Sequence, residues 1–336
     1  MGLACQESTP TDQKSSAATL DTLVFEQRLK PQNLRKPPAK QGAKAKRLYL
    51  PVEEESNQFD LSGLGHVSDR AEWGAPLAAA RHGAQQSCSL DMVLVGAEFC
   101  IDRYEAHLVD AQAGRWLSPH YPPARDSTAL LLARWTKSAP RSGRQMGRDL
   151  AVPAPPDFQL LEDFRPRAEN ERGVLPAGYL NRGQAETACA SAGKRLCTRD
   201  EWVRACRGEQ GTRFPYGENY REGACNVHRK HHPARLLHGD SSRHHLDPRL
   251  GLASDEDGPL LRRTGETEQC ASRWGSDAIY DMVGNLDEWV ADPSGAFLGG
   301  FYSRATKAGC DASIDSHSPG YFDYSLGTRC CADLAH

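Results

Sequence analysis

Short apolar runs separated by glycine and proline set the pattern of this chain over most of its length. Residues 91–95 and 98–105 hold such runs on either side of Gly96, which predicts two short strands joined by a turn. Two later segments, 298–302 and 327–331, have the same character and predict further strand pieces. Much of the remaining pattern is one of loops and turns.

Two helices are predicted in the middle of the chain. Residues 181–192 are rich in alanine, and Gly193 directly after them is the residue type that most often ends a helix. The second helix begins after Thr198, whose spacing to Glu201 is that of a capping box. In such a box the hydroxyl and the carboxylate bond the unpaired backbone N–H groups of the first turn. Gly208 ends this helix.

The first part of the chain lacks any sustained periodicity. Residues 27–47 are rich in Lys, Arg, Pro and Gln and have almost no apolar side chains, so they cannot bury enough surface to offset the entropy of ordering. We therefore interpret residues 1–87 as a disordered, partly basic tether. Residues 110–178 have scattered Pro and Gly without a clean period, and are interpreted as an insertion of loops.

Composition narrows the class of protein. The chain has 336 residues and a formal net charge of -3, which is enough length for one or two domains and argues against a general nucleic-acid binder. There is no run of about 18 apolar residues, so no α-helical membrane span is predicted.

Cysteine usage suggests an oxidising compartment. Ten of the 11 cysteines lie from residue 88 onward, an even number typical of a disulfide-stapled domain. The eleventh, Cys5, follows Leu3-Ala4 and precedes a Ser/Thr-rich stretch, like the end of a bacterial lipoprotein signal. Met1 to Ala4 is too short to be a signal peptide, so lipidation of Cys5 and an ordinary free thiol both stay open.

Two segments have candidate metal chemistry. The stretch 228–245 holds six histidines, which could bind Zn or Cu, but no two of them lie on a convincing helix face. The stretch 281–289 places Asp281 and Glu288 on either side of a Gly-Asn turn, and such oxygen ligands suit Ca²⁺. From these residues alone, a calcium site and a capped turn with solvent-facing acids are equally supported.

An ordered series of motifs resembles the formylglycine-generating enzyme, or sulfatase-modifying factor, family from about residue 88 to 333. The motifs are Asp102-Arg103-Tyr104-Glu105, Ala192-Gly193-Lys194-Arg195-Leu196-Cys197-Thr198-Arg199-Asp200-Glu201-Trp202, Ala205-Cys206-Arg207-Gly208, Phe214-Pro215-Tyr216-Gly217, Tyr280-Asp281-Met282-Val283-Gly284-Asn285 to Glu288-Trp289, Gly299-Gly300 and Gly327-Thr328-Arg329-Cys330. Each motif is weak alone, and their common order carries the resemblance.

The resemblance implies one irregular α+β domain at 88–333, related to the C-type lectin fold, with insertions at about 110–178 and 228–265. It also implies bound Ca²⁺ held by the side chains of Asp281 and Glu288 and by the backbone carbonyls of Gly284 and Leu286. A second calcium site of the family uses an asparagine where Asn226 stands.

The resemblance organises the cysteines as well. It implies the pairs Cys189–Cys330 and Cys206–Cys310. We infer Cys88–Cys100, Cys225–Cys270 and Cys197–Cys331 for the others. The last pair has a directional argument, since Cys330 and Cys331 are adjacent in a strand, point to opposite faces and need different partners.

Departures from the family pattern fall at its catalytic centre. Catalytic members hold Cu(I) between two cysteines, and alignment on the Gly-Gly motif puts Arg304 and Gly309 at these positions. The only nearby thiol is Cys310, which the resemblance already assigns to a disulfide with Cys206. Asp287 stands where the family usually has Trp. No catalytic residue is therefore assigned.

Two functions of different classes stay open. The first is a non-catalytic, calcium-stabilised module outside the cytoplasm that binds an unknown protein, peptide or glycan. It would be periplasmic, secreted, or attached to a membrane only through a lipid at Cys5. The second is a metal-dependent oxidoreductase using non-haem Fe or Cu, with ligands from five histidines: His228, His231, His232, His238 and His317.

Overall fold

The structure is a computed structural model that describes residues 88–141 and 143–334. The tether expected at 1–87, including Cys5, lies outside these residues. The described helices are α2 (Arg125–Ser138), α3 (Gln145–Asp149), α4 (Asp157–Leu161), α5 (Arg182–Ser191), α6 (Arg199–Arg207) and α7 (Pro233–His238), with short 3-10 turns at Ala139–Arg141, Leu250–Leu252 and Gly309–Asp311. None of the helices in this part of the chain is long and apolar enough to cross a membrane.

Short strands form two four-stranded sheets and three two-stranded sheets. The strands are β1 (Met92–Val95), β2 (Phe99–Asp102), β3 (His107–Asp110), β4 (Pro166–Glu169), β5 (Arg195–Leu196), β6 (Ser254–Asp255), β7 (Gly258–Pro259), β8 (Ala271–Trp274), β9 (Asp277–Tyr280), β10 (Asp287–Trp289), β11 (Phe297–Leu298), β12 (Ser313–Ile314), β13 (Leu326–Gly327) and β14 (Cys330–Asp333). One sheet has the order β1-β2-β14-β5 and the other β12-β11-β10-β13. The pairs are β3-β4, β6-β7 and β8-β9.

The two predicted helices form for the local reasons that the sequence suggests. In α6 the Thr198 hydroxyl accepts from the Glu201 N–H, and the Glu201 carboxylate accepts from the Thr198 N–H. Gly208 follows at φ 66°, a conformation that glycine adopts without strain. Both helices bury a cysteine on their inner face, Cys189 on α5 and Cys206 on α6.

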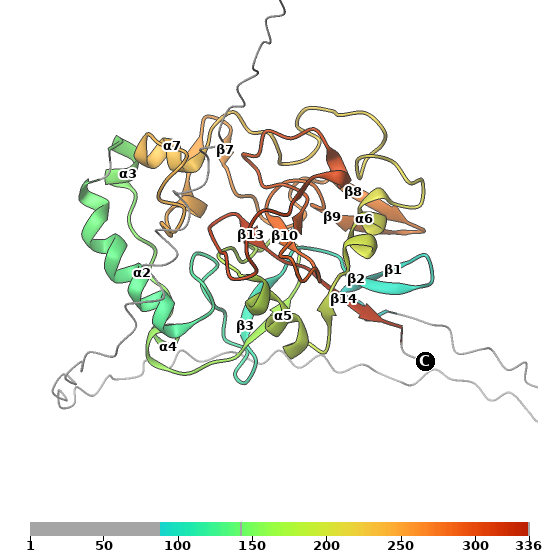
Figure 1. The fold of residues 1–336 in the computed structure, drawn as a ribbon, viewed down its shortest axis with the longest axis horizontal. Coiled ribbons are helices and arrows are strands. Elements are labelled where there is room, and N and C mark those ends of the chain that lie inside the picture. The colour runs from blue at the N-terminus through green and yellow to red at the C-terminus, as the bar shows by residue number, and fades with distance from the viewer. Residues whose placement is uncertain (1–87, 142, 335–336) are drawn as a thin grey trace, which may run out of the picture. The chain divides into compact units, whose positions relative to one another are not determined.

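Residues 110–178 are more regular than the loop insertion that we expected. The expectation was wrong for Arg125–Ser138, which form the 14-residue helix α2. This helix buries Thr128, Leu131 and Trp135, three residues that recur at intervals of three and four, against a small cluster with Tyr121. The apolar stripe is narrow, and exposed Leu130 obscures it in the sequence. Figure 1 shows α2, α3 and α7 on the side of the domain opposite β1, β2 and α6.

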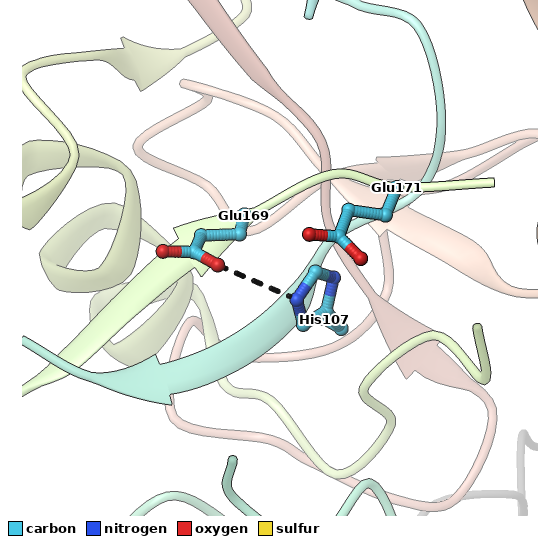
Figure 2. Close-up of side chains that lie close together, drawn as sticks. All are labelled: His107, Glu169 and Glu171. Carbon is cyan, nitrogen blue, oxygen red and sulfur yellow. Dashed lines mark ion pairs between the residues drawn. The ribbon is translucent and has the colours of Figure 1, made fainter. Parts of the chain in front are cut away.

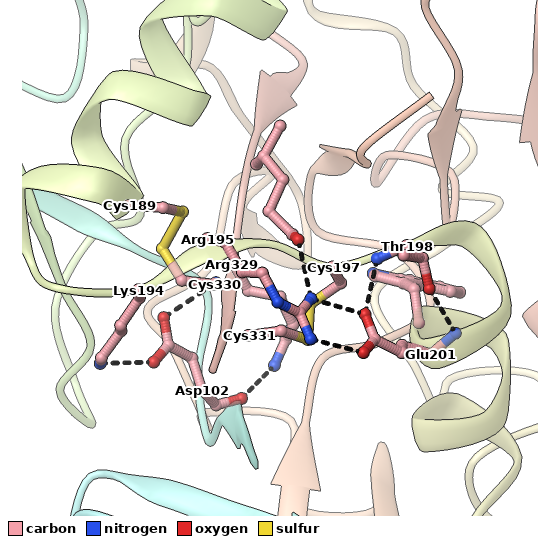
Figure 3. The surroundings of a disulfide bond; sticks show 12 residues. Asp102, Cys189, Lys194, Arg195, Cys197, Thr198, Glu201, Arg329, Cys330 and Cys331 are labelled. Atoms are coloured by element: carbon pink, nitrogen blue, oxygen red, sulfur yellow. Dashed lines mark hydrogen bonds and ion pairs between the residues drawn. A yellow bond between two sulfur atoms is a disulfide. The ribbon is translucent and has the colours of Figure 1, made fainter. Parts of the chain in front are cut away.

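Five disulfides staple the domain, and they are the pairings expected from the sequence. They are Cys88–Cys100, Cys189–Cys330, Cys197–Cys331, Cys206–Cys310 and Cys225–Cys270. Cys330 packs with Cys189 in one hydrophobic cluster, and Cys331 packs with Cys197 in another. The strand β14 therefore lies between two parts of the core and is bonded to each of them (Figure 3).

Charged side chains also hold β14 in place. Asp102 on β2 is fully buried; its Oδ2 accepts from the Cys330 N–H at 2.9 Å, and its Oδ1 from Lys194 Nζ at 2.6 Å (Figure 3). Arg195 on β5 makes a bidentate contact with Glu201 of α6 and reaches Asp333 at 2.6 Å. Burial raises the pKa of Asp102 to about 6, although Lys194 opposes this shift.

Candidate functional site

The turn between Asp281 and Glu288 is buried, not solvent-facing. Gly284 lies at φ 87°, and a Cβ there would come within 2.2 Å of the Asn226 carbonyl oxygen. The Asn285 N–H donates to that same oxygen at 2.8 Å, and Asn226 Nδ2 donates to Asn285 Oδ1 at 3.0 Å. The structure thus brings Asn226 directly against the Gly-Asn turn, and a side chain at position 284 would separate the two.

The two predicted calcium carboxylates have protein partners. Asp281 Oδ2 accepts from the Gly265 N–H at 2.6 Å. Glu288 is bonded by both of its oxygens to fully buried Arg329, at 2.8 to 3.0 Å, and Oε2 also accepts from Trp202 Nε1 at 2.6 Å. The Glu288 carboxylate therefore faces the Arg329 guanidinium.

Sequence reasoning missed a third buried carboxylate at the turn. Glu105 accepts from Leu286 N at 3.0 Å and from Asn285 Nδ2 at 2.6 Å. Its place could be found only from the resemblance, since Glu105 ends a family motif more than 170 residues away in the chain. Glu105, Asp281 and Glu288 give three buried carboxyl groups to one fully buried guanidinium, that of Arg329.

Burial and, after it, the neighbouring carboxylates raise the pKa values of two of these acids. Burial, reinforced by the charges of Asp281 and Glu288, raises the pKa of Glu105 well above its usual range. Burial raises the pKa of Asp281 to about 7, although the Gly265 N–H opposes the shift. One polar atom also lacks a partner here, because Asn226 Oδ1 is buried without a hydrogen bond among the described residues. Asn226 Oδ1 is therefore a free acceptor and the carboxylates are in surplus, but Glu105, Asp281 and Glu288 are not among the described groups with ligand atoms within 4.8 Å of one another, and Glu288 faces Arg329.

The positions of the family's copper cysteines have a different chemistry. Arg304 Nη2 bonds Asp287 Oδ2 at 2.5 Å, so two departures from the family pattern contact each other. Gly309 lies at φ 65° beside the Arg213 carbonyl and the Phe214 ring. Cys310 is bonded to Cys206 and is fully buried, so it offers no thiolate.

The histidines proposed as iron or copper ligands have separate positions. His232 accepts from the Ala234 N–H at the start of α7, and His238 Nε2 lies 2.8 Å from Asp247. His317 stacks on Tyr321 with ring centroids 4.0 Å apart. His228 has a tilted contact with the Tyr220 ring. His231 gathers with Asp255 and Glu256, which lie near it at 3.3 to 3.4 Å.

A second acidic histidine cluster was not expected from the sequence. His107 of β3 lies beside Glu169 of β4 and near Glu171 (Figure 2). The alternate spacing of Glu169 and Glu171 is visible in the sequence, but His107 lies 62 residues before Glu169 and nothing in the chain links them. Only the pairing of β3 with β4 brings the three together.

Comparison with solved structures gives several distant likenesses. The Major Tropism Determinant I1 variant is 13% identical, with a TM-score of 0.37 over 74% of this chain and 54% of its own. CarF is 13% identical with a TM-score of 0.35, covering 70% of this chain and 87% of CarF. PvdO from Pseudomonas aeruginosa is 15% identical with a TM-score of 0.34, covering 70% and 80%. The chain thus spans about half the length of the first of these proteins. No curated protein matches the chain.

The family comparison is direct. The model of the sulfatase-modifying factor enzyme 1-like domain matches residues 158–333, more than half of the chain, and includes α5, α6, the Gly-Asn turn and β14. The short elements and the disulfides described above make up an irregular, disulfide-rich α+β domain. The chain belongs to the family of sulfatase-modifying factor enzyme 1-like domains.

Proposed function

We propose that this chain is a non-catalytic binding or structural module of the sulfatase-modifying factor family. The observation that carries the proposal is the ion pair between Arg304 and Asp287, which occupies the region of the family's copper cysteines. Cu(I) is a soft ion that needs soft thiolate ligands, and a guanidinium is a fixed cation that repels it. The neighbouring thiol cannot substitute, because Cys310 is bonded to Cys206.

The contrasting proposal, an oxidoreductase with an altered metal centre, has weaker support. It would draw ligands from His228, His231, His232, His238 and His317. Across the described residues, no group of three ligand atoms within 4.8 Å of one another contains two of these histidines. A non-haem iron centre usually needs at least two imidazoles with a carboxylate on one face.

An activity assay tests the proposal. The purified chain is incubated with Cu(I), oxygen and a peptide containing Cys-x-Pro-x-Arg, and mass spectrometry follows the conversion of Cys to formylglycine. We expect no turnover above a no-enzyme control, while an active formylglycine-generating enzyme converts the peptide in parallel. Turnover that is lost in a Cys310→Ser variant would overturn the proposal and place the catalytic thiol at Cys310.

For the binding role, the structure offers one hollow of about 760 Å³ beside α6. Its lining includes Arg199, Arg204 and Arg207 together with the apolar side chains of Trp274 and Leu298. Each arginine has an acidic neighbour, such as Asp311 for Arg207 at 2.6 Å. A mixed apolar and charged surface of this kind suits a protein, peptide or glycan ligand, and we place the partner here.

Calcium is the second part of the proposal. The surplus of buried carboxyl groups at Glu105, Asp281 and Glu288, together with the unpaired Asn226 Oδ1, supports a cation at the Gly-Asn turn. The carbonyls of Gly284 and Leu286 belong to this turn, and Ca²⁺ takes such oxygen ligands. An ion bound at the turn would stabilise the domain, because it binds the folded state and not the unfolded state.

The disulfides support a proposal about the compartment. Five disulfides in one domain are typical of an oxidising environment and rare in the cytosol. We therefore propose a periplasmic, outer-membrane-anchored or secreted location. A lipid on Cys5 would supply the anchor, and mass spectrometry of the native protein tests for it.

A further inference from the structure

His107, Glu169 and Glu171 form a compact group of metal-ligating side chains that includes no residue of the Gly-Asn turn and neither Arg304 nor Asp287. In the antiparallel pair of β3 and β4, His107 lies directly opposite Glu169. Glu171 follows Glu169 by two residues, a spacing that returns an extended chain to the same face. One ligand atom from each residue lies within 4.8 Å of the others, and Figure 2 shows both carboxylates directed to the imidazole.

The imidazole of His107 is buried without a hydrogen-bond partner among the described residues. The residue is 2% exposed, and neither Nδ1 nor Nε2 has a hydrogen bond among the described residues. Its Nε2 lies 3.6 Å from Glu169 Oε2, which is too long for a hydrogen bond. Trp116 stacks on the ring at 4.2 Å between centroids and fixes its orientation.

The two carboxylates leave negative charge at the cluster. Glu169 Oε1 accepts from Arg167, while Oε2 faces His107. In the part of the chain that the structure describes, Glu171 has no cationic partner and its side chain is exposed. An ion can therefore enter from solvent, and His107 also lies on the wall of a hollow of about 280 Å³.

A second cluster provides a useful contrast. His231, Asp255 and Glu256 also have ligand atoms within 4.8 Å of one another. There, however, Arg229 lies 2.6 Å from Asp255 and Lys230 lies 3.1 Å from Glu256, so each carboxylate is already matched by a cation. Both carboxylates of this cluster are therefore offset by cations, whereas at His107 only Glu169 is paired, with Arg167, and Glu171 is not.

We propose that His107, Glu169 and Glu171 bind one divalent transition-metal ion, with Zn²⁺ as the representative probe. One imidazole and two carboxylates are a borderline ligand set, suited to Zn²⁺, Fe²⁺ or Mn²⁺ and less suited to Ca²⁺, which prefers all-oxygen sites. Three protein ligands leave room for water or a bound ligand, as in zinc sites that are not purely structural. This inference is independent of the module's partner and of the calcium turn.

The test is calorimetric titration of Zn²⁺ into the chelator-stripped full-length chain, with and without Ca²⁺. We expect one saturable Zn²⁺ site per chain that calcium does not block. The principal variant is Glu171→Gln, because Glu171 is exposed and its replacement leaves the fold intact. It should weaken Zn²⁺ binding at least about tenfold, the lower range for disturbing a metal shell. Glu186→Gln, an exposed glutamate on α5, is the matched control and should leave the affinity unchanged.

Two further measurements separate this site from others. His231→Ala should leave Zn²⁺ binding unchanged, and the Co²⁺-loaded protein should show no thiolate charge-transfer band, which would indicate Cys5. The proposal is overturned by the absence of a saturable site, by equal affinity in wild type and Glu171→Gln, by loss of binding in His231→Ala, or by a thiolate band.

Discussion

Arg304 and Asp287 form an ion pair, with 2.5 Å between Nη2 and Oδ2, although 17 residues separate them in the chain. Asp287 is 1% exposed, and burial raises its pKa to about 6 against the opposing charge of Arg304. Arg304 also lies over the Phe301 ring at 5.2 Å. Two departures from the family pattern are therefore linked, because the buried Asp287 carboxylate would be costly without the Arg304 guanidinium.

This dependence gives a prediction for stability. Arg304→Ala should lower the free energy of unfolding by about 2–3 kcal/mol, because it leaves the buried Asp287 carboxylate unpaired. The same change in an Asp287→Asn background should cost at least about 1 kcal/mol less, since residues in contact are energetically coupled. Chemical denaturation of the four proteins measures both quantities. Arg199→Ala is the control, because its pair with Asp315 is exposed and should contribute under about 1 kcal/mol. Equal costs in the two backgrounds would contradict the coupling.

Gly309 should resist replacement by any side chain. A Cβ at this position would lie 2.3 Å from the Arg213 carbonyl oxygen and 2.9 Å from the Phe214 ring, at a φ of 65° that non-glycine residues rarely adopt. We expect Gly309→Ala to destabilise the domain by about 3 kcal/mol or more. Gly320→Ala is the control, because nothing lies within 4 Å of a Cβ there. Similar melting temperatures for the two variants would show that the Arg213 loop adapts. A copper-binding pair of cysteines at 304 and 309 is consequently not restored by substitution alone.

The cysteines of the domain should all be oxidised. Thiol titration of the denatured, unreduced chain is expected to find no reactive cysteine between residues 88 and 331. A free thiol in the preparation should map to Cys5, which peptide mapping after alkylation can verify. Two or more alkylated cysteines within the domain would contradict the five pairings.

Stability should depend on pH through Asp281. Burial raises the folded pKa of this group from 3.8 to about 7, so the folded state binds a proton that the unfolded state has released. The contribution of Asp281 is therefore fully present below about pH 4 and is lost as the pH rises to about 7. Between these values one such group lowers the unfolding free energy by up to about 1.4 kcal/mol per pH unit.

Asp281→Asn isolates this contribution. Asn tolerates the φ of 60° at this position and can still accept from the Gly265 N–H. In chelator, the difference in stability between variant and wild type should move in favour of the variant from pH 4 to pH 7. Parallel stability curves for the two proteins over this range would show that Asp281 titrates normally.

Calcium should act in the opposite direction. A Ca²⁺ ion at the turn needs deprotonated carboxylates, and those of Glu105 and Asp281 have raised pKa values. We expect added Ca²⁺ to raise the melting temperature more at pH 8 than at pH 6, relative to chelator. Asn226→Ala should remove much of this difference. A calcium effect that is the same at both pH values and in the variant would place the ion elsewhere or exclude it.

Features set by neighbours in the chain could be predicted from the sequence. The capping box of Thr198 and Glu201 formed as expected because both partners lie within one helical turn. The opposite directions of Cys330 and Cys331 follow from the alternation of a strand, and this is why their separate partners could be inferred. The bounds of the domain and two of its disulfide pairs were predicted from the resemblance to the family.

Features that depend on distant partners could not be predicted in this way. Glu288 was expected to face an ion, but the sequence gives no sign that Arg329, 41 residues later, would reach both of its oxygens. The cluster at His107 depends on the register of β3 and β4, which short strands do not specify by pattern alone. Helix α2 was missed because only three of its residues are buried, too few to give a clear helical pattern in the sequence.

The position of β14 also determines the order in which this domain can be completed during synthesis. Cys189 and Cys197 are made early, yet their partners follow 141 and 134 residues later. Until Cys330 and Cys331 are made, Cys189 on α5 and Cys197 directly after β5 are unpaired thiols that can pair wrongly with other cysteines already synthesised. Correct closure of both halves of the core is therefore a late event, so efficient production of this protein should depend on a disulfide isomerase that corrects early pairings after translation.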